Sequence, residues 1–245
     1  MIELLHGDCL ELMKNIPDRS IDLVLTDPPY GTTACKWDSV IPFEPMWKEL
    51  KRIRKDNAAI CLFGSEPFSS HLRMSNIKEF KYDWIWNKKL PTNHLNAKKQ
   101  PLRLCELISV FYIKQCFYAP IKTIGHKRKT ATTKYEKKNL GEQVYGNEKR
   151  NTFYDSAERY PNGLIEFSNA DKRVVHPTQK PVALLEYLIK TYTLENETVL
   201  DFTAGSFSTA VACINTSRNF IGIEKEESYF EIGKKRVKEA QDAKI

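Results

Sequence analysis

The chain has 245 residues, of which 41% are hydrophobic and 28% charged, and its formal net charge is +7 with a pI near 9.0. This length can bury a complete core and leave room for an insertion. The sequence contains no run approaching the roughly 20 uncharged apolar residues of a membrane span and no signal-peptide pattern, so we expect a cytoplasmic protein without a membrane partner. The positive charge is compatible with a polyanionic partner but identifies none.

The cysteines argue against a disulfide framework and against zinc. None forms a C-x-x-C pair, and several lie inside apolar runs, which is typical of buried, reduced thiols. No cluster of metal-ligating residue types stands out, so we expect no metal. The six are Cys9, Cys35, Cys61, Cys105, Cys116 and Cys213.

The N-terminal part of the chain predicts strands that alternate with helices. Residues 21–26 are β-branched and leucine-rich, which indicates a buried strand, and residues 43–55 place apolar side chains at helical spacing. The expected order is a strand at 2–8, a helix at 9–15, a strand at 21–26, a helix at 43–55, a strand at 58–64 and a helix at 67–75.

Four residues, Asp27-Pro28-Pro29-Tyr30, close the strand at 21–26. Two successive prolines cannot continue a ladder, so the chain turns out at the carboxyl end of the strand, which is the edge where parallel sheets bind ligands. The Asp27 carboxylate and the Pro28 carbonyl offer two acceptors for an exocyclic amine, and the Tyr30 ring offers a face for a base. A strand end capped by an Asp-Pro turn is the plainer interpretation.

Two further strands are expected at 82–88 and 106–112. No helical pattern joins them, so we expect an antiparallel pair at one edge of the sheet. The loop between them is basic and would lie close to the substrate, where Lys88, Lys98 and Lys99 are predicted to contact nucleic acid.

Hydrophobic periodicity fades between residues 116 and 172. Basic residues alternate there with tyrosines, and Lys127, Arg128 and Lys129 are consecutive. A solvated insertion or a disordered arm would carry the same charge. The interleaved aromatic residues favour a small nucleic-acid-binding module in which these three residues contact phosphates.

Order resumes with His176-Pro177-Thr178-Gln179-Lys180-Pro181 before a helix at 182–192. A strand at 198–201, a turn of small residues at 202–206, a helix at 207–215 and a strand at 219–224 follow, and a charged helix at 227–241 ends the chain. Glu224 stands about twenty residues after the turn, a spacing typical of units that bind an adenosine moiety.

Together these pieces resemble the amino-methylating DNA methyltransferases in the circularly permuted arrangement of the β class, with phage-encoded and orphan bacterial members similar around residues 64–68. The resemblance covers the chain except about residues 115–170. Its motifs stand in family order: Gly7-Asp8, Asp27 to Tyr30, His176 to Pro181, Asp201 to Thr209, and Glu224.

The resemblance implies an α/β, Rossmann-like methyltransferase fold with a seven-stranded, mostly parallel sheet that has one antiparallel strand. The N-terminal strand would lie beside the strand at 219–224. It also implies a catalytic half at 1–115, a target-recognition insertion at 116–172 and a half that binds S-adenosylmethionine at 173–245.

The resemblance further assigns roles to single residues. Asp27, Pro28 and Tyr30 match the catalytic motif, and Pro29 shapes it. S-adenosylmethionine is the implied methyl donor. The residues implied for its binding are Asp8, Cys9, Asp27, Thr178, Lys180, Asp201, Thr203, Ala204, Gly205, Ser206 and Glu224.

One departure concerns the cofactor turn. The family normally has Phe at the position of Thr203 and Gly at the position of Phe207. The Phe207 ring could narrow the cofactor pocket or rotate away from it, and the sequence leaves both outcomes open.

The sequence therefore predicts an enzyme that methylates adenine N6 in double-stranded DNA. Its target would be flipped out of the duplex, stacked on Tyr30 and bonded through its amine to Asp27 and Pro28.

Cytosine-N4 methylation remains open, although that branch more often has Ser at the position of Asp27. An RNA substrate and a catalytically silent DNA-binding or partner subunit also remain open. A nicotinamide oxidoreductase is disfavoured, because the full G-x-G-x-x-G is absent. A homodimer and a cognate restriction endonuclease are partners that the resemblance leaves undecided.

Overall fold

The computed structural model describes residues 1–33, 35, 38–134, 151–169 and 179–244. Its contacts divide the chain into two compact units, Met1–Ala119 with Gly163–Ile245, and Pro120–Asn162. In the described part of the chain, no helix is long and apolar enough to cross a membrane.

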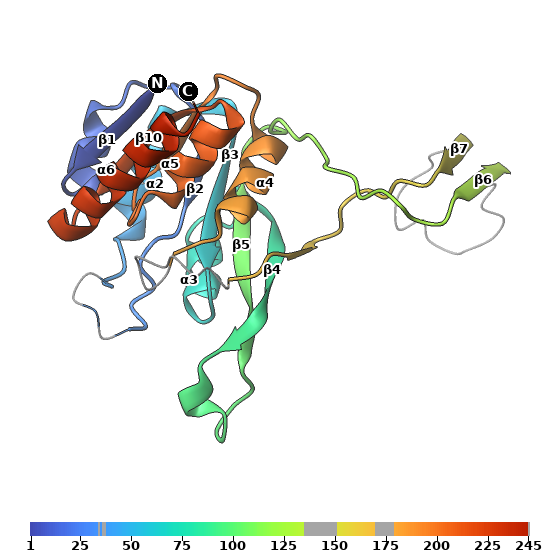
Figure 1. The fold of residues 1–245 in the computed structure, drawn as a ribbon, viewed down its shortest axis with the longest axis horizontal. Helices are drawn as coiled ribbons and strands as arrows, with labels where there is room; N and C mark the ends of the chain where they lie inside the picture. The colour runs from blue at the N-terminus through green and yellow to red at the C-terminus, as the bar shows by residue number, and fades with distance from the viewer. Residues whose placement is uncertain (34, 36–37, 135–150, 170–178, 245) are drawn as a thin grey trace. The chain divides into compact units, whose positions relative to one another are not determined.

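Eight of the described strands form one sheet, in the order β1-β10-β9-β2-β3-β5-β4-β8 (Figure 1). β5 runs antiparallel to both of its neighbours, and the other neighbouring pairs are parallel. The predicted mostly parallel sheet with one antiparallel strand is confirmed, and β8 adds an eighth strand at one edge. The bounds are β1 (Ile2–His6), β2 (Ile21–Thr26), β3 (Arg54–Gly64), β4 (Phe80–Thr92), β5 (Arg103–Phe111), β8 (Leu164–Glu166), β9 (Thr198–Asp201) and β10 (Asn219–Glu224).

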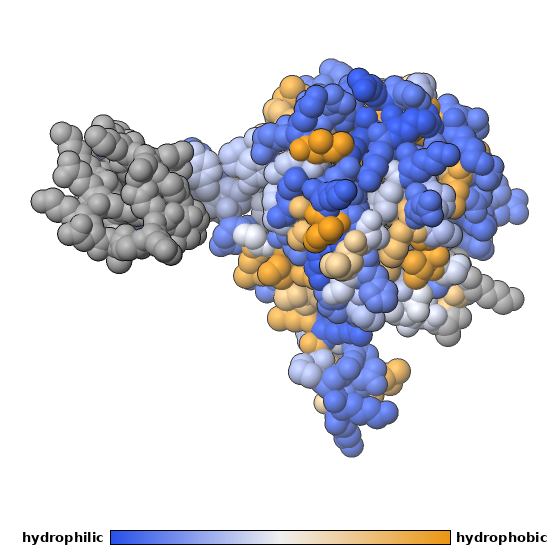
Figure 2. Space-filling model, turned by 180° about the vertical axis from the view of Figure 1, so that it is seen from behind, coloured by the Kyte–Doolittle hydropathy of each residue, from blue (hydrophilic) through white to orange (hydrophobic). Residues whose placement is uncertain are grey.

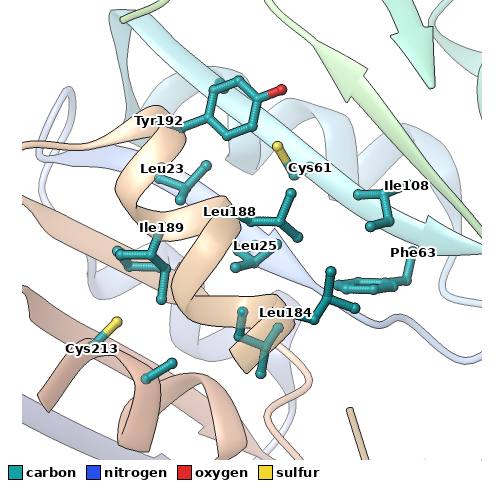
Figure 3. Packing of buried hydrophobic residues seen from close by; sticks show 14 of the residues in the cluster. Leu23, Leu25, Cys61, Phe63, Ile108, Leu184, Leu188, Ile189, Tyr192 and Cys213 are labelled. Atoms are coloured by element: carbon teal, nitrogen blue, oxygen red, sulfur yellow. The ribbon is translucent and has the colours of Figure 1, made fainter. Parts of the chain in front are cut away.

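Helices cover both faces of this sheet, because its strands are apolar on both sides. Leu23 and Leu25 of β2 pack in one hydrophobic cluster with α4 and α5 (Figure 3), whereas Val24 packs in a second cluster with α2 and α3. The bounds are α1 (Cys9–Leu12), the 3-10 turn η1 (Met13–Asn15), α2 (Phe43–Ile53), α3 (Phe68–Ser75), α4 (Val182–Tyr192), α5 (Ser208–Thr216) and α6 (Glu227–Asp242).

The two ends of the chain meet in the sheet, as predicted. β1 pairs with β10 along its whole length, and the Gly7 amide donates a 2.9 Å hydrogen bond to the Glu224 carbonyl. β9 pairs with β10 on one side and with β2 on the other. The carboxyl ends of these four strands therefore lie at one edge, which brings Asp8, Asp27, Asp201 and Glu224 to the same side of the sheet.

β4 and β5 continue beyond the sheet as a hairpin (Figure 1). β4 runs parallel to β2, so this hairpin leaves the sheet at the edge where Asp27 lies. Pairing shifts between Asn87 and Thr92, where a bulge interrupts the ladder, and the short 3-10 turn η2 (His94–Asn96) forms the tip. On the face drawn in Figure 2 the hairpin is covered mainly by hydrophilic residues.

The second unit is a small antiparallel element. β6 (Lys129–Lys134) pairs with β7 (Asn151–Ser156). An isolated antiparallel β-bridge joins Thr123 to Arg159. Arg128 donates two 2.6 Å hydrogen bonds to the Asp155 carboxylate. Part of the basic charge of this unit is thus paired with its own acidic residues.

Phe207 faces the core and does not line the site. It adopts left-handed backbone angles of φ 57° and ψ 36°, is fully buried, and packs on Phe220 and Phe230. A Cβ at Gly233 would lie 2.0 Å from its ring, and one at Gly222 would lie 2.7 Å away. Burying the ring stabilises by about 1.5–3 kcal/mol, which offsets the roughly 1–2 kcal/mol cost of the left-handed backbone. Two glycines therefore make room for the ring, and the cofactor turn keeps its shape.

Candidate active site

A cavity of about 570 Å³ opens where the carboxyl ends of the parallel strands lie. One end is lined by Asp8 and Glu224, the other by Lys88 and Glu106, and Asp27 lies on its wall. This volume falls in the usual range of roughly 300–1,000 Å³ for ligand pockets. Asp27 lies between two groups of lining residues. Its carboxylate bonds Lys180, which contacts Glu106, and its carbonyl accepts from Thr203 of the turn that Glu224 fixes.

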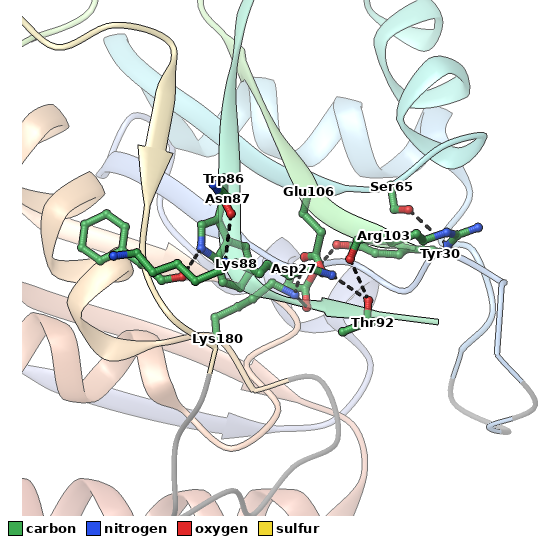
Figure 4. Close-up of polar contacts among 12 residues, drawn as sticks. Asp27, Tyr30, Ser65, Trp86, Asn87, Lys88, Thr92, Arg103, Glu106 and Lys180 are labelled. Atoms are coloured by element: carbon green, nitrogen blue, oxygen red, sulfur yellow. Dashed lines mark hydrogen bonds and ion pairs between the residues drawn. The ribbon is translucent and has the colours of Figure 1, made fainter. Parts of the chain in front are cut away.

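Asp27 is held from two sides. The Tyr30 hydroxyl donates to Oδ1 at 2.5 Å, and the Lys180 ammonium donates to Oδ2 at 2.5 Å (Figure 4). Burial raises the pKa of Asp27, and the Lys180 charge opposes that rise. Burial alone would lower the pKa of Lys180, yet Asp27 and Glu106 raise it above its usual value. The Lys180 side chain thus faces the Asp27 carboxyl as an ion pair at 2.5 Å.

The ion pair continues into a chain of four charges. Lys180 Nζ lies 3.4 Å from Glu106 Oε2, and Lys88 Nζ lies 3.2 Å from Glu106 Oε1. Burial opposes ionisation of Glu106, but the two ammonium groups keep its pKa below the usual value. Two carboxylates and two ammonium groups thus neutralise one another in a buried row, which lowers the cost of removing each from water.

Lys88 was predicted to contact nucleic acid from the basic loop. Its side chain is buried, lines the cavity and bonds Thr92 at 2.9 Å, so it faces the cavity and not the outer surface of the hairpin. The bulge in β4 turns it inward, as bulges often do beside active sites. Lys98 and Lys99 are exposed on the hairpin, and Lys127, Arg128 and Lys129 are exposed in the second unit.

Tyr30 is fixed by more than its hydroxyl. Its ring stacks on Phe68 with centroids 5.0 Å apart, and the hydroxyl bond to Asp27 sets the ring's angle. Pro28, Pro29 and Tyr30 all line the cavity. The motif therefore presents two oxygen acceptors and one ring to the same space.

Asp38 organises the loop that follows Tyr30. Its Oδ1 accepts hydrogen bonds from the amides of Tyr30 and Gly31, at 2.8 and 2.9 Å, and its Oδ2 accepts from those of Thr32 and Thr33, at 2.9 and 2.6 Å. Burial raises the pKa of Asp38, but hydrogen bonds from the Thr33 hydroxyl and from the amides of residues 31–33 give a net lowering. The sequence analysis missed this residue. The sequence carried one signal for it, a run of small residues followed by an acid. Consecutive backbone amides in a loop need an acceptor, and the acid supplies one.

The turn after β9 is fixed by two buried acids. Asp201 accepts hydrogen bonds from the hydroxyls of Thr26 at 2.9 Å and Thr209 at 2.6 Å, which tie β2 and α5 to the turn. Glu224 accepts from the amides of Gly205 and Glu226, both at 2.7 Å. Gly205 has a φ of 53°, so the turn needs a residue that tolerates left-handed angles.

Ten of the eleven predicted cofactor residues line the cavity. Thr203 Oγ1 donates to the Asp27 carbonyl at 3.1 Å, which links the turn to the catalytic motif. Burial raises the pKa of the Cys9 thiol to about 12, so Cys9 presents a neutral side chain. Thr178 lies outside the described residues. The predicted residues that line the cavity are Asp8, Cys9, Asp27, Lys180, Asp201, Thr203, Ala204, Gly205, Ser206 and Glu224.

Comparison with known proteins gives matches over nearly the whole chain. The sequence model of a family described as DNA methylase matches residues 21–235. The DNA adenine methyltransferase YhdJ of Escherichia coli (strain K12) is 28% identical, over 96% of this chain and 82% of the relative.

Two solved structures are similar. The crystal structure of the M1.HpyAVI–SAM complex has a TM-score of 0.65 and 27% identity, over 97% of this chain and 99% of the other. The PvuII DNA methyltransferase, described as cytosine-N4-specific, also has a TM-score of 0.65 but 16% identity, over 98% and 91%. At that identity the likeness to the PvuII enzyme concerns the fold alone.

Asp201→Asn is expected to flatten the dependence of stability on pH. Burial raises the pKa of Asp201 to about 6, whereas an unfolded Asp titrates near 3.9. Between these values the folded protein binds the proton more readily. The wild-type free energy of unfolding should therefore fall by about 3 kcal/mol as the pH rises from about 4 to about 6, and then level off.

Urea unfolding of both proteins at about pH 4 and about pH 7 measures this effect. Asp242→Asn, at the exposed end of α6, is the control for the loss of one carboxylate. The same pH dependence in Asp201→Asn and wild type would contradict the assignment.

Proposed function

Because this chain belongs to the family of DNA methylases and is an amino-methylating, S-adenosylmethionine-dependent enzyme, we propose that it methylates the N6 amine of adenine in duplex DNA. The observation that carries the proposal is the fixed Asp27 carboxylate on the wall of the cavity. An amine needs such an acceptor to turn its lone pair out of the plane of the ring.

We assign the Glu224 end of the cavity to the cofactor. The Glu224 carboxylate accepts one backbone bond at each oxygen, which leaves it capacity for ribose hydroxyls. The left-handed Gly205 lets a ligand approach the backbone without a side chain in the way. Asp27 and Asp201 supply negative charge along the wall that a sulfonium would face. The bound cofactor supplies an electrophilic methyl group.

The Glu106 end would then receive the target base. A base paired in a duplex cannot reach a buried donor, so it must leave the stack. Asp27 and the Pro28 carbonyl would each accept one hydrogen of the exocyclic amine, while Tyr30 supports the ring. Holding the amine in line in this way lowers the barrier through orientation. Methylation makes the nitrogen acidic, and its extra proton can pass to Asp27.

Lys180 has a positioning role in this scheme. Its ammonium keeps Asp27 ionised and fixes Oδ2, while Glu106 holds the ammonium in place. A protonated Asp27 would lose an acceptor at the oxygen that carries the proton. The buried charges therefore serve to keep an acceptor available in a site that burial would otherwise neutralise.

Adenine is favoured over cytosine by two observations. An acidic residue occupies position 27, and the cytosine-N4 branch more often has Ser there. The relative YhdJ is described as an adenine methyltransferase and is 28% identical to this chain. The fold itself does not discriminate, because the cytosine-N4-specific PvuII enzyme shares it.

Identifying the methylated base tests the proposal. DNA from cells that express the protein, digested to nucleosides and analysed by mass, should contain N6-methyladenine that is absent from cells expressing Asp27→Asn. N4-methylcytosine in place of N6-methyladenine would overturn the assignment of the base while leaving the enzyme class unchanged.

Asp27→Asn is expected to lower methyl transfer by at least about 100-fold, because the amide turns one acceptor into a donor and removes the negative charge. Binding of S-adenosylmethionine should change little, since Glu224 and the turn at 203–206 provide most of its proposed contacts. A methyl-transfer assay beside titration calorimetry separates the two quantities. Near wild-type transfer by Asp27→Asn would refute the mechanism.

We propose that the second unit, Pro120–Asn162, contributes to target recognition. Lys127 and Lys129 are exposed, whereas Arg128 is paired with Asp155. Phosphate contacts by lysines release counterions, so their number sets the salt dependence of binding.

Replacing Lys127 and Lys129 by glutamine should weaken DNA binding and reduce the slope of log affinity against log salt by up to about 0.9 for each phosphate that is no longer neutralised. Lys190→Gln with Lys235→Gln, on exposed positions of α4 and α6, makes the same change in net charge. Equal slopes for the two double variants would assign recognition to another part of the chain.

A further inference from the structure

The tip of the β4–β5 hairpin presents a leucine to solvent. Leu95 is 100% exposed and lies in the middle of η2. Scattered apolar residues on a surface need no explanation, but a fully exposed leucine at the end of a projecting hairpin has no neighbour to pack on. The residue also lies close to the cavity.

The hairpin grows out of the rim of the cavity. Thr92 lines the cavity and is the last residue of β4, paired with Arg103 of β5. Leu95 follows three residues later, so its Cα lies within about 11 Å of the Cα of Thr92. Leu95 therefore lies close to the rim of the cavity.

The tip has a defined conformation. Asn93 has a left-handed φ of 72°, and its carbonyl accepts from the Asn96 amide at 3.1 Å. The Asn96 side chain donates to the Asn93 side chain at 2.7 Å, and the Ala97 amide donates to the His94 carbonyl at 3.1 Å. The turn is therefore closed by its own hydrogen bonds, and Leu95 is held outward.

The charge around Leu95 fits a polyanion. Lys98 and Lys99 follow it on the exposed surface of the hairpin, and His94 precedes it. A core position would be buried, and a solvated loop is normally polar, so a fully exposed apolar residue beside two lysines fits neither. It matches what duplex opening requires, namely an apolar wedge for the base stack and cations for the neighbouring phosphates.

We propose that Leu95 enters the base stack of duplex DNA beside the target nucleotide, while Lys98 and Lys99 contact the flanking phosphates. The wedge fills the space that the extruded base leaves and so favours the open duplex. The inference rests on methyl transfer to a flipped-out base, but it does not depend on whether that base is adenine or cytosine.

The test compares Leu95→Ala on two DNA substrates that carry the methylated site, once that site has been found by sequencing modified DNA. One substrate is a perfect duplex, and the other has a mismatch opposite the target, which lowers the cost of extrusion. The matched control is Leu194→Ala, an exposed leucine before β9 and therefore at the opposite edge of the sheet.

Leu95→Ala should lower kcat/KM on the perfect duplex by about tenfold or more, and the mismatch should restore most of the loss. Leu194→Ala should match wild type on both substrates. Wild-type activity of Leu95→Ala on the perfect duplex would overturn the proposal, as would an equal loss on both substrates. A change in oligomeric state with Leu95→Ala, measured by sedimentation, would instead assign the tip to contact with a second copy of this chain.

A methylated cytosine in the product would contradict the proposed base, yet the comparison of the two substrates would still decide the role of Leu95. Binding of S-adenosylmethionine, measured in parallel, should be the same in Leu95→Ala and wild type. A weaker cofactor affinity would point to a general disturbance of the fold and would overturn the proposal.

Discussion

The buried ion pair between Asp27 and Lys180 is the interaction on which the site depends. It joins residues 153 positions apart, one after β2 and the other just before α4. Taking two charges out of water costs several kcal/mol for each ion, and such pairs are often no better for stability than apolar contacts. A pair of this kind on the wall of a cavity is therefore better explained by a role in the reaction than by a contribution to stability. The Lys180 charge opposes the rise in the pKa of Asp27 that burial causes.

The same pair connects the catalytic motif to the hairpin. Lys180 contacts Glu106 of β5, and Glu106 contacts Lys88 of β4, so the row of charges ends at the base of the projecting strands. Both strands continue from these residues toward the tip. A displacement of the hairpin would thus change the contacts of Glu106 and, through Lys180, those of Asp27. If the hairpin contacts DNA as proposed, that contact is physically connected to the position of Asp27 within one compact unit.

Much of the fold could be read from the sequence because its signals are local. The apolar run of β2, its termination by two prolines and the amphipathic pattern of α2 each depend on a few neighbouring residues. Side-chain directions, by contrast, depend on distant partners. Lys88 turns inward because a bulge re-aims it toward Glu106.

Phe207 illustrates the same limit in the core. A phenylalanine at a left-handed position conflicts with local preference, and the glycines that accommodate it stand 15 and 26 residues further along the chain. Asp38 was missed because it bonds backbone amides, for which the sequence offered only a run of small residues followed by an acid. Local rules fail where a residue's role is set by packing or by main-chain bonding.

If the stretch Pro120–Asn162 reads DNA sequence as proposed, the residues for recognition and those for the reaction come from different parts of the chain. The described residues that line the cavity all come from Met1–Ala119 and Gly163–Ile245, so the stretch Pro120–Asn162 contributes none of them. Within the described structure, strands β6 and β7 of that stretch pair only with each other. If this stretch contacts DNA as proposed, substitutions there would alter those contacts and leave the groups around Asp27 and Glu224 in place. The proposed contacts with the amine and the cofactor depend instead on groups that the sheet positions, such as Asp201, which bonds Thr26 and Thr209.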